Sequence, residues 1–149
     1  NVKLNHLVPN CYSNQLFKNI LDDSSSTNFF GRIYVAKDAQ KSEALQANHN
    51  LILCDKAKVK TKPQLEIYAD DVICNHGATI GKINEDELFY MRSRGITLHE
   101  AKILQLLSFT SDITNSITTD ALKERLNLLV EKRLRGEFSN NNNCSKNCC

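Results

Sequence analysis

The sequence predicts a mainly β protein that ends in α-helices. Two observations lead to this prediction. Short runs of β-branched and aromatic residues recur between residues 29 and 83, and helix-capping signals recur between residues 84 and 136. Runs of this length and composition are typical of strands, whereas a side chain that can accept from the first helical N–H groups marks the start of a helix. We therefore expect strands first and helices second.

Three runs in the strand-rich region share one pattern, in which a short apolar stretch leads into a charged turn and then a small apolar residue. They cover residues 32–39, 51–57 and 65–72. No helical segment separates them, and no Asn-Gly or Asp-Gly pair joins them into a tight hairpin. The stacked rungs of a solenoid fit this pattern, and so does a β-sandwich. The pattern alone leaves both architectures open.

The two ends of the chain have a different composition. Residues 1–28 are polar and finish in a run of Asp, Ser, Thr and Asn, which predicts an irregular linker. Residues 137–149 are rich in Asn and carry three of the six cysteines, and this composition predicts a disordered Asn/Cys tail.

The helical region, residues 84–136, opens with two capping signals. Asn84 precedes Glu87 by three residues, and Thr97 precedes Glu100 by the same spacing. In each pair the first side chain can accept from a backbone N–H and the second can reach back. Gly95, between the two signals, predicts the end of the first helix.

A third helix is predicted from Thr119 or Asp120 to a stop at Gly136. Its apolar residues recur at helical spacing and form one face: Leu122, Leu126, Leu129, Val130 and Leu134. Charged residues occupy the other face. A helix this amphipathic must cover another surface, which is either the end of the strand region or a partner.

Charge and cysteine usage exclude several classes of function. The net charge of +2, from 19 basic and 17 acidic residues, predicts no nucleic-acid partner. No apolar stretch approaches the roughly 20 residues of a membrane helix, so we expect no membrane insertion. The six cysteines lack the spacing of a disulfide framework or a zinc site, which favours a reducing compartment. Asn1 in place of Met indicates a piece of a longer chain.

The densest chemical signal is the segment 69–79, in which Cys74 and His76 are two residues apart. On a strand this spacing places both side chains on one face. A thiolate and an imidazole can bind iron or zinc, or they can act as nucleophile and base. The structural alternative is a buried small Cys beside a hydrogen-bonded strand His. These alternatives stay open, and a metal would need further ligands from elsewhere.

Four stretches, residues 46–53, 61–72, 74–81 and 88–96, resemble the SufD family in order and spacing. The resemblance covers about residues 30–113 and continues more loosely to residue 136. It implies the end of a right-handed parallel β-helix at residues 29–83, followed by a small C-terminal helical domain at residues 84–136. It also implies that the chain is the C-terminal portion of a longer protein.

The resemblance implies a subunit of the SufBCD iron–sulfur cluster assembly scaffold and not an enzyme. It implies a SufB-like paralogue at the β-helix edge and a SufC-like ABC-type ATPase at the helical domain. His76 and Cys74 are the implied contacts of a transient iron–sulfur cluster, and of its iron, shared with the paralogue. The implied location is a plastid-type organelle in a eukaryote or the cytoplasm in a bacterium. Four residues of the third helix are the expected partner-binding residues: Leu122, Arg125, Leu126 and Leu129.

Three other functions stay open. A SufB-like cluster carrier typically has a cysteine close to the position of Asn48 and a Glu at the position of Gly77, and both departures favour SufD. A Cys/His-dependent enzyme would need a depressed pKa at Cys74. A purely structural module would join the paralogue without touching a cluster.

Overall fold

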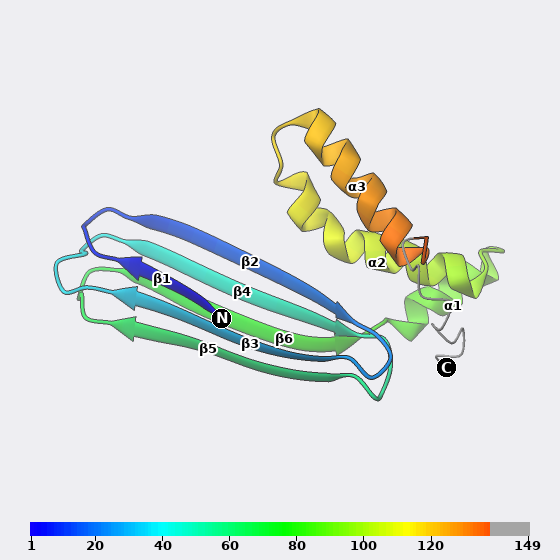
Figure 1. Cartoon of the computed structure of the whole chain (residues 1–149), viewed down its shortest axis with the longest axis horizontal. Helices are drawn as coiled ribbons and strands as arrows, with labels where there is room; N and C mark the ends of the chain where they lie inside the picture. Colours follow the sequence, from blue (N-terminus) through cyan, green and yellow to red (C-terminus); the bar gives the residue numbers. More distant parts are fainter. Residues whose placement is uncertain (138–149) are drawn as a thin grey trace. The chain divides into compact units, whose positions relative to one another are not determined.

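The computed structural model describes residues 1–137, which divide into two compact units, Asn1–Gly81 and a second unit that begins at Lys82 (Figure 1). The first unit is built of strands and the second of helices. The prediction of mainly β structure followed by helices is therefore confirmed. Of the predicted Asn/Cys tail, residues 138–149 lie outside the described residues.

Six strands make up the first unit, arranged in two three-stranded sheets with the orders β1-β3-β5 and β2-β4-β6. Five of them have the same length, whereas β1 is shorter. Their bounds are β1 Val2–His6, β2 Tyr12–Leu21, β3 Ser26–Val35, β4 Glu43–Ile52, β5 Lys58–Ile67 and β6 Ile73–Lys82.

Consecutive strands alternate between the two sheets, so each strand pairs with the strand two places later in the chain. The pairs β1–β3, β2–β4 and β3–β5 are all parallel; Tyr12, for example, lies beside Glu43, and Ser26 beside Lys58. Parallel neighbours need a crossover connection, and here the intervening strand of the other sheet provides it. These parallel pairs differ from the antiparallel pairs of a typical β-sandwich.

The predicted linker at residues 1–28 is wrong, because β1, β2 and the start of β3 occupy this range. The polar sequence that suggested a linker belongs to strands whose inward positions are not all apolar. Asp23, in the predicted irregular run, does lie in a turn, with a left-handed φ of 54°. Local composition failed here because strand formation depends on pairing with β3 and β4.

The side chains of β4 alternate strictly between buried and half-buried positions from Glu43 to Asn50. This period of two places every second residue inside, between the two sheets. At one end of the strands the interior is apolar, with a cluster of small and branched side chains. The cluster contains Ile33, Val35, Ala39, Ala44 and Ala69.

Further along β4 the interior is lined by amides instead. Gln46, Asn48 and Asn50 are 3%, 0% and 2% exposed. Their hydrogen bonds run to neighbouring strands: Gln46 to Gln15 Oε1 at 2.7 Å, Asn48 to Thr61 Oγ1 at 3.2 Å, and Asn50 to the Thr79 carbonyl at 2.9 Å. A buried amide without a partner costs about 1–3 kcal/mol, so a shift in register would be expensive. These amides therefore help to fix the register of the stacked strands.

The second unit contains the helices α1 Glu85–Ser93, α2 Leu98–Asn115 and α3 Asp120–Leu134. The predicted caps of the first two are confirmed: Asn84 accepts from the N–H groups of Asp86 and Glu87, and Thr97 accepts from that of Glu100. Gly95 follows α1 with a positive φ of 90°, as expected for a stop. Thr119, before α3, makes no such cap bond.

The end of α3 is tied to the start of α2 by an ion pair. Arg135 donates to both carboxylate oxygens of Glu100, at 3.0 and 2.9 Å, and to Glu131 at 2.9 Å. The hydrogen bond from Arg135 lowers the pKa of the Glu100 carboxyl. Bidentate pairing of this kind fixes geometry as well as charge, and it orients α3 along α2.

Gly31→Ala tests the packing of the interior. A Cβ at Gly31 would approach the Gln46 side chain and the Phe29 ring within 2.8 Å. We expect a loss of about 1–3 kcal/mol in the free energy of unfolding, measured by urea denaturation, because overpacking forces neighbours out of place. Gly77→Ala is the control: nothing lies within 4 Å of its Cβ, so the change should stay within about 0.5 kcal/mol. Equal effects at both positions would contradict this packing.

Candidate functional site on the edge strand

The last strand, β6, carries both residues of the candidate site and lies at the edge of its sheet. The N–H of Ile73 donates to the carbonyl of Ser42 at 3.0 Å, just as Glu43 donates to Cys11 in the neighbouring parallel pair. This bond places Ile73 beside Glu43. By the same register Cys74 lies beside Ala44 and His76 lies beside Gln46. In the part of the chain that the structure describes, no strand pairs with the other edge of β6.

Cys74 points into the apolar end of the interior. Its side chain is partly buried and packs against the cluster formed by Ile33, Val35 and their neighbours. Burial raises the pKa of the thiol, and a hydrogen bond with the Ala44 backbone offsets part of that rise. A raised pKa keeps the thiol protonated at neutral pH, which is the opposite of what an activated nucleophile requires.

His76 occupies the same face of β6 but is exposed. None of the other residues from 1 to 137 forms a hydrogen bond with its ring. The other two histidines of the strands differ in this respect: buried His6 contacts Ser13 Oγ at 2.9 Å, and His49 contacts Thr79 Oγ1 at 2.8 Å. Among the three histidines of the sheets in residues 1–137, only His76 has an imidazole without a hydrogen bond. Its ring is thus available to a partner or ligand.

Cys74 and His76 do not form a complete metal site by themselves. No group of three or more His, Cys, Asp or Glu side chains that could hold a metal occurs within residues 1–137. The sulfur of a thiolate and the nitrogen of an imidazole are donor atoms that iron accepts as ligands. A closed tetrahedral site, however, needs about four ligands. The arrangement can therefore contribute ligands to a shared site at the edge.

Within residues 1–137, the last strand of each sheet, β5 in one and β6 in the other, has a free edge. The two strands differ in how this edge is protected from pairing with another chain. Strand β5 carries Lys58, Lys60 and Lys62, and it also contains Pro63. Lysines and proline are the usual devices that keep an edge strand from pairing with another chain. Strand β6 has neither a charge nor a proline from Ile73 to Gly81. The edge that carries His76 is therefore the one left open to pairing.

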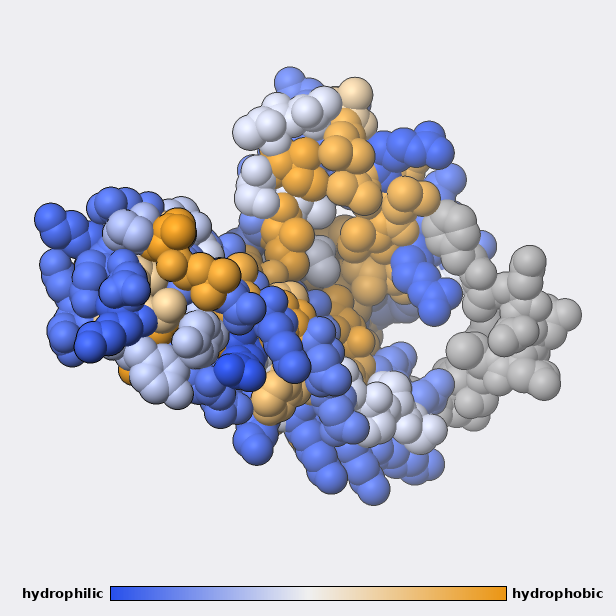
Figure 2. Space-filling model, turned by 60° about the vertical axis from the view of Figure 1, so that its left-hand side comes forward, coloured by the Kyte–Doolittle hydropathy of each residue, from blue (hydrophilic) through white to orange (hydrophobic). Residues whose placement is uncertain are grey.

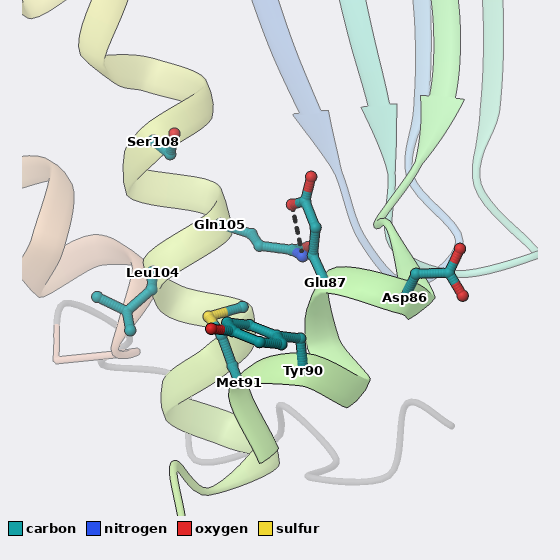
Figure 3. Close-up of a pocket in the computed structure, with 7 residues that line it drawn as sticks. All are labelled: Asp86, Glu87, Tyr90, Met91, Leu104, Gln105 and Ser108. Carbon is teal, nitrogen blue, oxygen red and sulfur yellow. Dashed lines mark hydrogen bonds between the residues drawn. The ribbon is translucent and has the colours of Figure 1, made fainter. Parts of the chain in front are cut away.

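The helical unit has a hollow between α1 and α2, of about 450 Å³ (Figure 3). Tyr90, Met91 and Leu104 form its apolar wall, and Asp86 lies at its rim. Gln105 donates to Glu87 Oε2 at 3.1 Å across it. No sequence pattern identified this hollow, because it depends on how two helices pack. The combination of acidic and apolar residues in the first turns of α1 was the available signal.

Helix α3 has no buried residue and exposes several leucines. Leu122 and Leu129 are 50% and 39% exposed, Arg125 is exposed, and Leu126 is half-buried. Figure 2 shows apolar side chains gathered over α2 and α3 on the face in view. The four expected partner-binding residues thus lie on one side of α3, next to the side that faces α2. Among the helices described, none is long and apolar enough to cross a membrane.

The fold and the site together define a protein of stacked parallel strands with a thiol and an imidazole on an exposed edge strand. A family model, "SUF system FeS cluster assembly, SufBD core domain", matches residues 1–109. The chain belongs to this SufBD family of iron–sulfur cluster assembly proteins, as the resemblance to SufD indicated.

Individual relatives agree with this assignment. The iron–sulfur cluster assembly protein SufD of Escherichia coli (strain K12) is 41% identical over 133 residues, which cover 89% of this chain and 31% of that protein. A SufBD family protein of Synechocystis is 42% identical over 89% of this chain and 29% of its own. The chloroplastic protein ABCI7 of Arabidopsis thaliana is 38% identical over 78% of this chain and 25% of its own. The chain thus spans about a third or less of these relatives.

The reactivity of Cys74 tests the environment of the thiol. Because burial raises its pKa, we expect slow alkylation by iodoacetamide at about pH 7.5 and a rate that still rises above about pH 9. Mass spectrometry of the labelled peptide measures the rate, with Cys74→Ser identifying the peptide. Rapid alkylation at neutral pH, faster than that of a free cysteine, would contradict this environment and favour the nucleophile.

Proposed function

We propose that the chain acts as the SufD-like part of an iron–sulfur cluster assembly scaffold, pairing with a SufB-like paralogue and docking a SufC-like ABC-type ATPase. One observation carries the proposal: β6 is an unprotected edge strand that displays an unpartnered imidazole, His76, beside the thiol of Cys74. A free backbone edge is a template for a strand of another chain. The family membership supplies the expected cargo, an iron–sulfur cluster.

In this proposal the two sheets are the last coils of a right-handed parallel β-helix. The support is the chain path, in which consecutive strands alternate between two sheets and each coil stacks in register on the previous one. Among residues 1–137 no further coil of strands covers the end of the interior between β5 and β6. A paralogue that adds its strands at β6 would cover this end and bring its own side chains next to His76.

The cluster is cargo in this scheme. His76 contributes an imidazole ligand from the exposed edge, while Cys74 lies deeper and contributes a thiolate only after deprotonation. The paralogue provides the remaining ligands, because two are too few for a closed site. Metal binding and thiol deprotonation are coupled, so loading of Cys74 would release a proton. The chain itself holds and positions the cluster and performs no bond chemistry of its own.

The ATPase docks on the helical unit in this proposal. Leu122, Leu129 and Arg125 give α3 an apolar stripe with a cation at its border. The ion pair of Arg135 with Glu100 holds α3 against α2, so movement of a bound partner is transmitted to both helices. The hollow between α1 and α2 offers a second contact, whose acidic rim suits a basic side chain.

A SufB-like cluster carrier is disfavoured by the environment of Asn48. This residue is fully buried, and its amide bonds with Asn19 and Thr61. An inward side chain satisfied in this way is part of the interior and provides no ligand. The cellular location follows the relatives in this proposal: plastid, as for the chloroplastic Arabidopsis protein, or cytoplasm, as expected for a bacterial protein.

His76→Ala tests the site. In the full parent protein, co-expressed with the paralogue and the ATPase, we expect the complex to co-purify as before but the yield of assembled cluster to fall about tenfold or more, because one ligand of a shared site is lost. The cluster is measured by its absorption and by iron analysis. His49→Ala is the matched control on the neighbouring strand and should retain the yield. An unchanged yield in His76→Ala would remove this residue from the site.

Leu129→Asp tests ATPase docking. A charge in the centre of an apolar contact should weaken ATPase binding by about tenfold or more, measured by co-purification and calorimetry, with unchanged helix content by circular dichroism. Leu128→Asp is the matched control, since Leu128 is 52% exposed on the same helix but lies on another side. Equal effects of both substitutions, or no effect of Leu129→Asp, would place the docking surface elsewhere.

A further inference from the structure

The interior of the strand unit contains a buried hydrogen-bond acceptor that is not used. Gln46 is 3% exposed, and its Oε1 atom has no hydrogen-bond partner among the described residues. An unsatisfied buried acceptor destabilises the folded state and needs an explanation. The rest of this amide is engaged, because Nε2 donates to Gln15 Oε1 at 2.7 Å.

The position of the free oxygen is determined by its surroundings. Gln15 lies beside Gln46 in the register of β2 with β4, so one hydrogen bond extends toward the preceding coil. Gly31, on the facing sheet, has no Cβ, and an added one would lie closest to the free Oε1 of Gln46, with Cδ at 2.8 Å, so the oxygen lies against this glycine. The glycine therefore leaves the space that the amide occupies.

The next member of the same row is His76. The hydrogen bond from Ile73 to Ser42 sets the register of β6 on β4, and that register continues the row Gln15–Gln46 with His76. Two inward rows further along β4 the buried amide is satisfied by β6, since Asn50 donates to the Thr79 carbonyl at 2.9 Å. In the row of Gln46 the β6 residue, His76, has an imidazole without a hydrogen bond, and the amide of Gln46 one coil earlier has an oxygen without one.

We propose that Gln46 is the positioning residue of His76: its Oε1 accepts a hydrogen bond from one ring N–H when a partner covers the open end. The inference rests on the proposed function, since it assigns His76 as a ligand. A neutral imidazole carries one N–H and one acceptor nitrogen, and a hydrogen bond to one fixes the role of the other. The unprotonated nitrogen is then available to the cluster, as a metal ligand requires.

The test is the tautomer of neutral His76 in the full parent protein in complex with its SufB-like paralogue. Solid-state NMR of protein with 15N-labelled histidines gives the ring shifts of both nitrogens, and His76→Ala identifies the signals. We expect one tautomer to dominate in the wild type, and Gln46→Leu to change the tautomer ratio about fivefold, the effect of one hydrogen bond. The readout is taken without metal, so it does not depend on cluster assembly.

Asn50→Leu is the matched control, because it removes another buried amide of β4 that lies beside a different β6 residue. It should cost stability but leave the ratio at His76 unchanged. Gln46→Met replaces the leucine variant if that variant does not fold, since Met is closer in shape to Gln and a much weaker acceptor. An unchanged ratio in a folded Gln46 variant, or the same change in Asn50→Leu, would overturn the inference.

The two proposals fail separately. If His76→Ala retains full cluster yield but Gln46 controls the tautomer, the ligand role falls and the hydrogen bond stands. If cluster yield depends on His76 but the tautomer ratio does not change in the Gln46 variants, the proposed function is supported and the positioning role of Gln46 is wrong.

Discussion

The structure depends on the parallel register of its two sheets. Each strand returns to the same sheet only after the chain has crossed the other one, so every backbone ladder joins residues far apart in sequence. Such pairing provides no stabilising contacts between residues close in sequence while a coil is forming. The inward side chains must therefore fix the register, and they do so in two ways: an apolar cluster around Ile33 and Val35, and a buried set of amides on β4.

The amides matter because they allow only one alignment. A slip of one residue would turn Gln46, Asn48 and Asn50 to the outer face and bring Glu43, Ala47 or His49 inside. The hydrogen bonds of Asn48 and Asn50 to neighbouring strands would be lost together. The same alignment decides which side chains of β6 lie above the interior. The location of His76 beside Gln46 is thus a consequence of the interior and not of β6 alone.

The stacking also explains why the candidate site lies on a free edge. A coil can hydrogen-bond only to the coils on either side of it, so the last strand of each sheet has a free edge. The chain protects one of these edges with Lys58, Lys60, Lys62 and Pro63 and leaves the other without such protection. Combined with membership of the SufBD family, this difference supports the proposal that β6 is the edge at which a cluster is shared.

The sequence by itself determined the local features. The caps at Asn84 and Thr97 and the stop at Gly95 were readable because each depends on residues within one helical turn. The family was readable from motifs in order, and the strand runs from their composition. Only the tertiary structure decided the rest. The first 28 residues form strands because they pair with distant partners, and Cys74 is partly buried because the facing sheet covers it. Gln46 donates to Gln15 on the preceding coil while its Oε1 atom has no hydrogen-bond partner among the described residues, and such long-range relations leave no local pattern in the sequence.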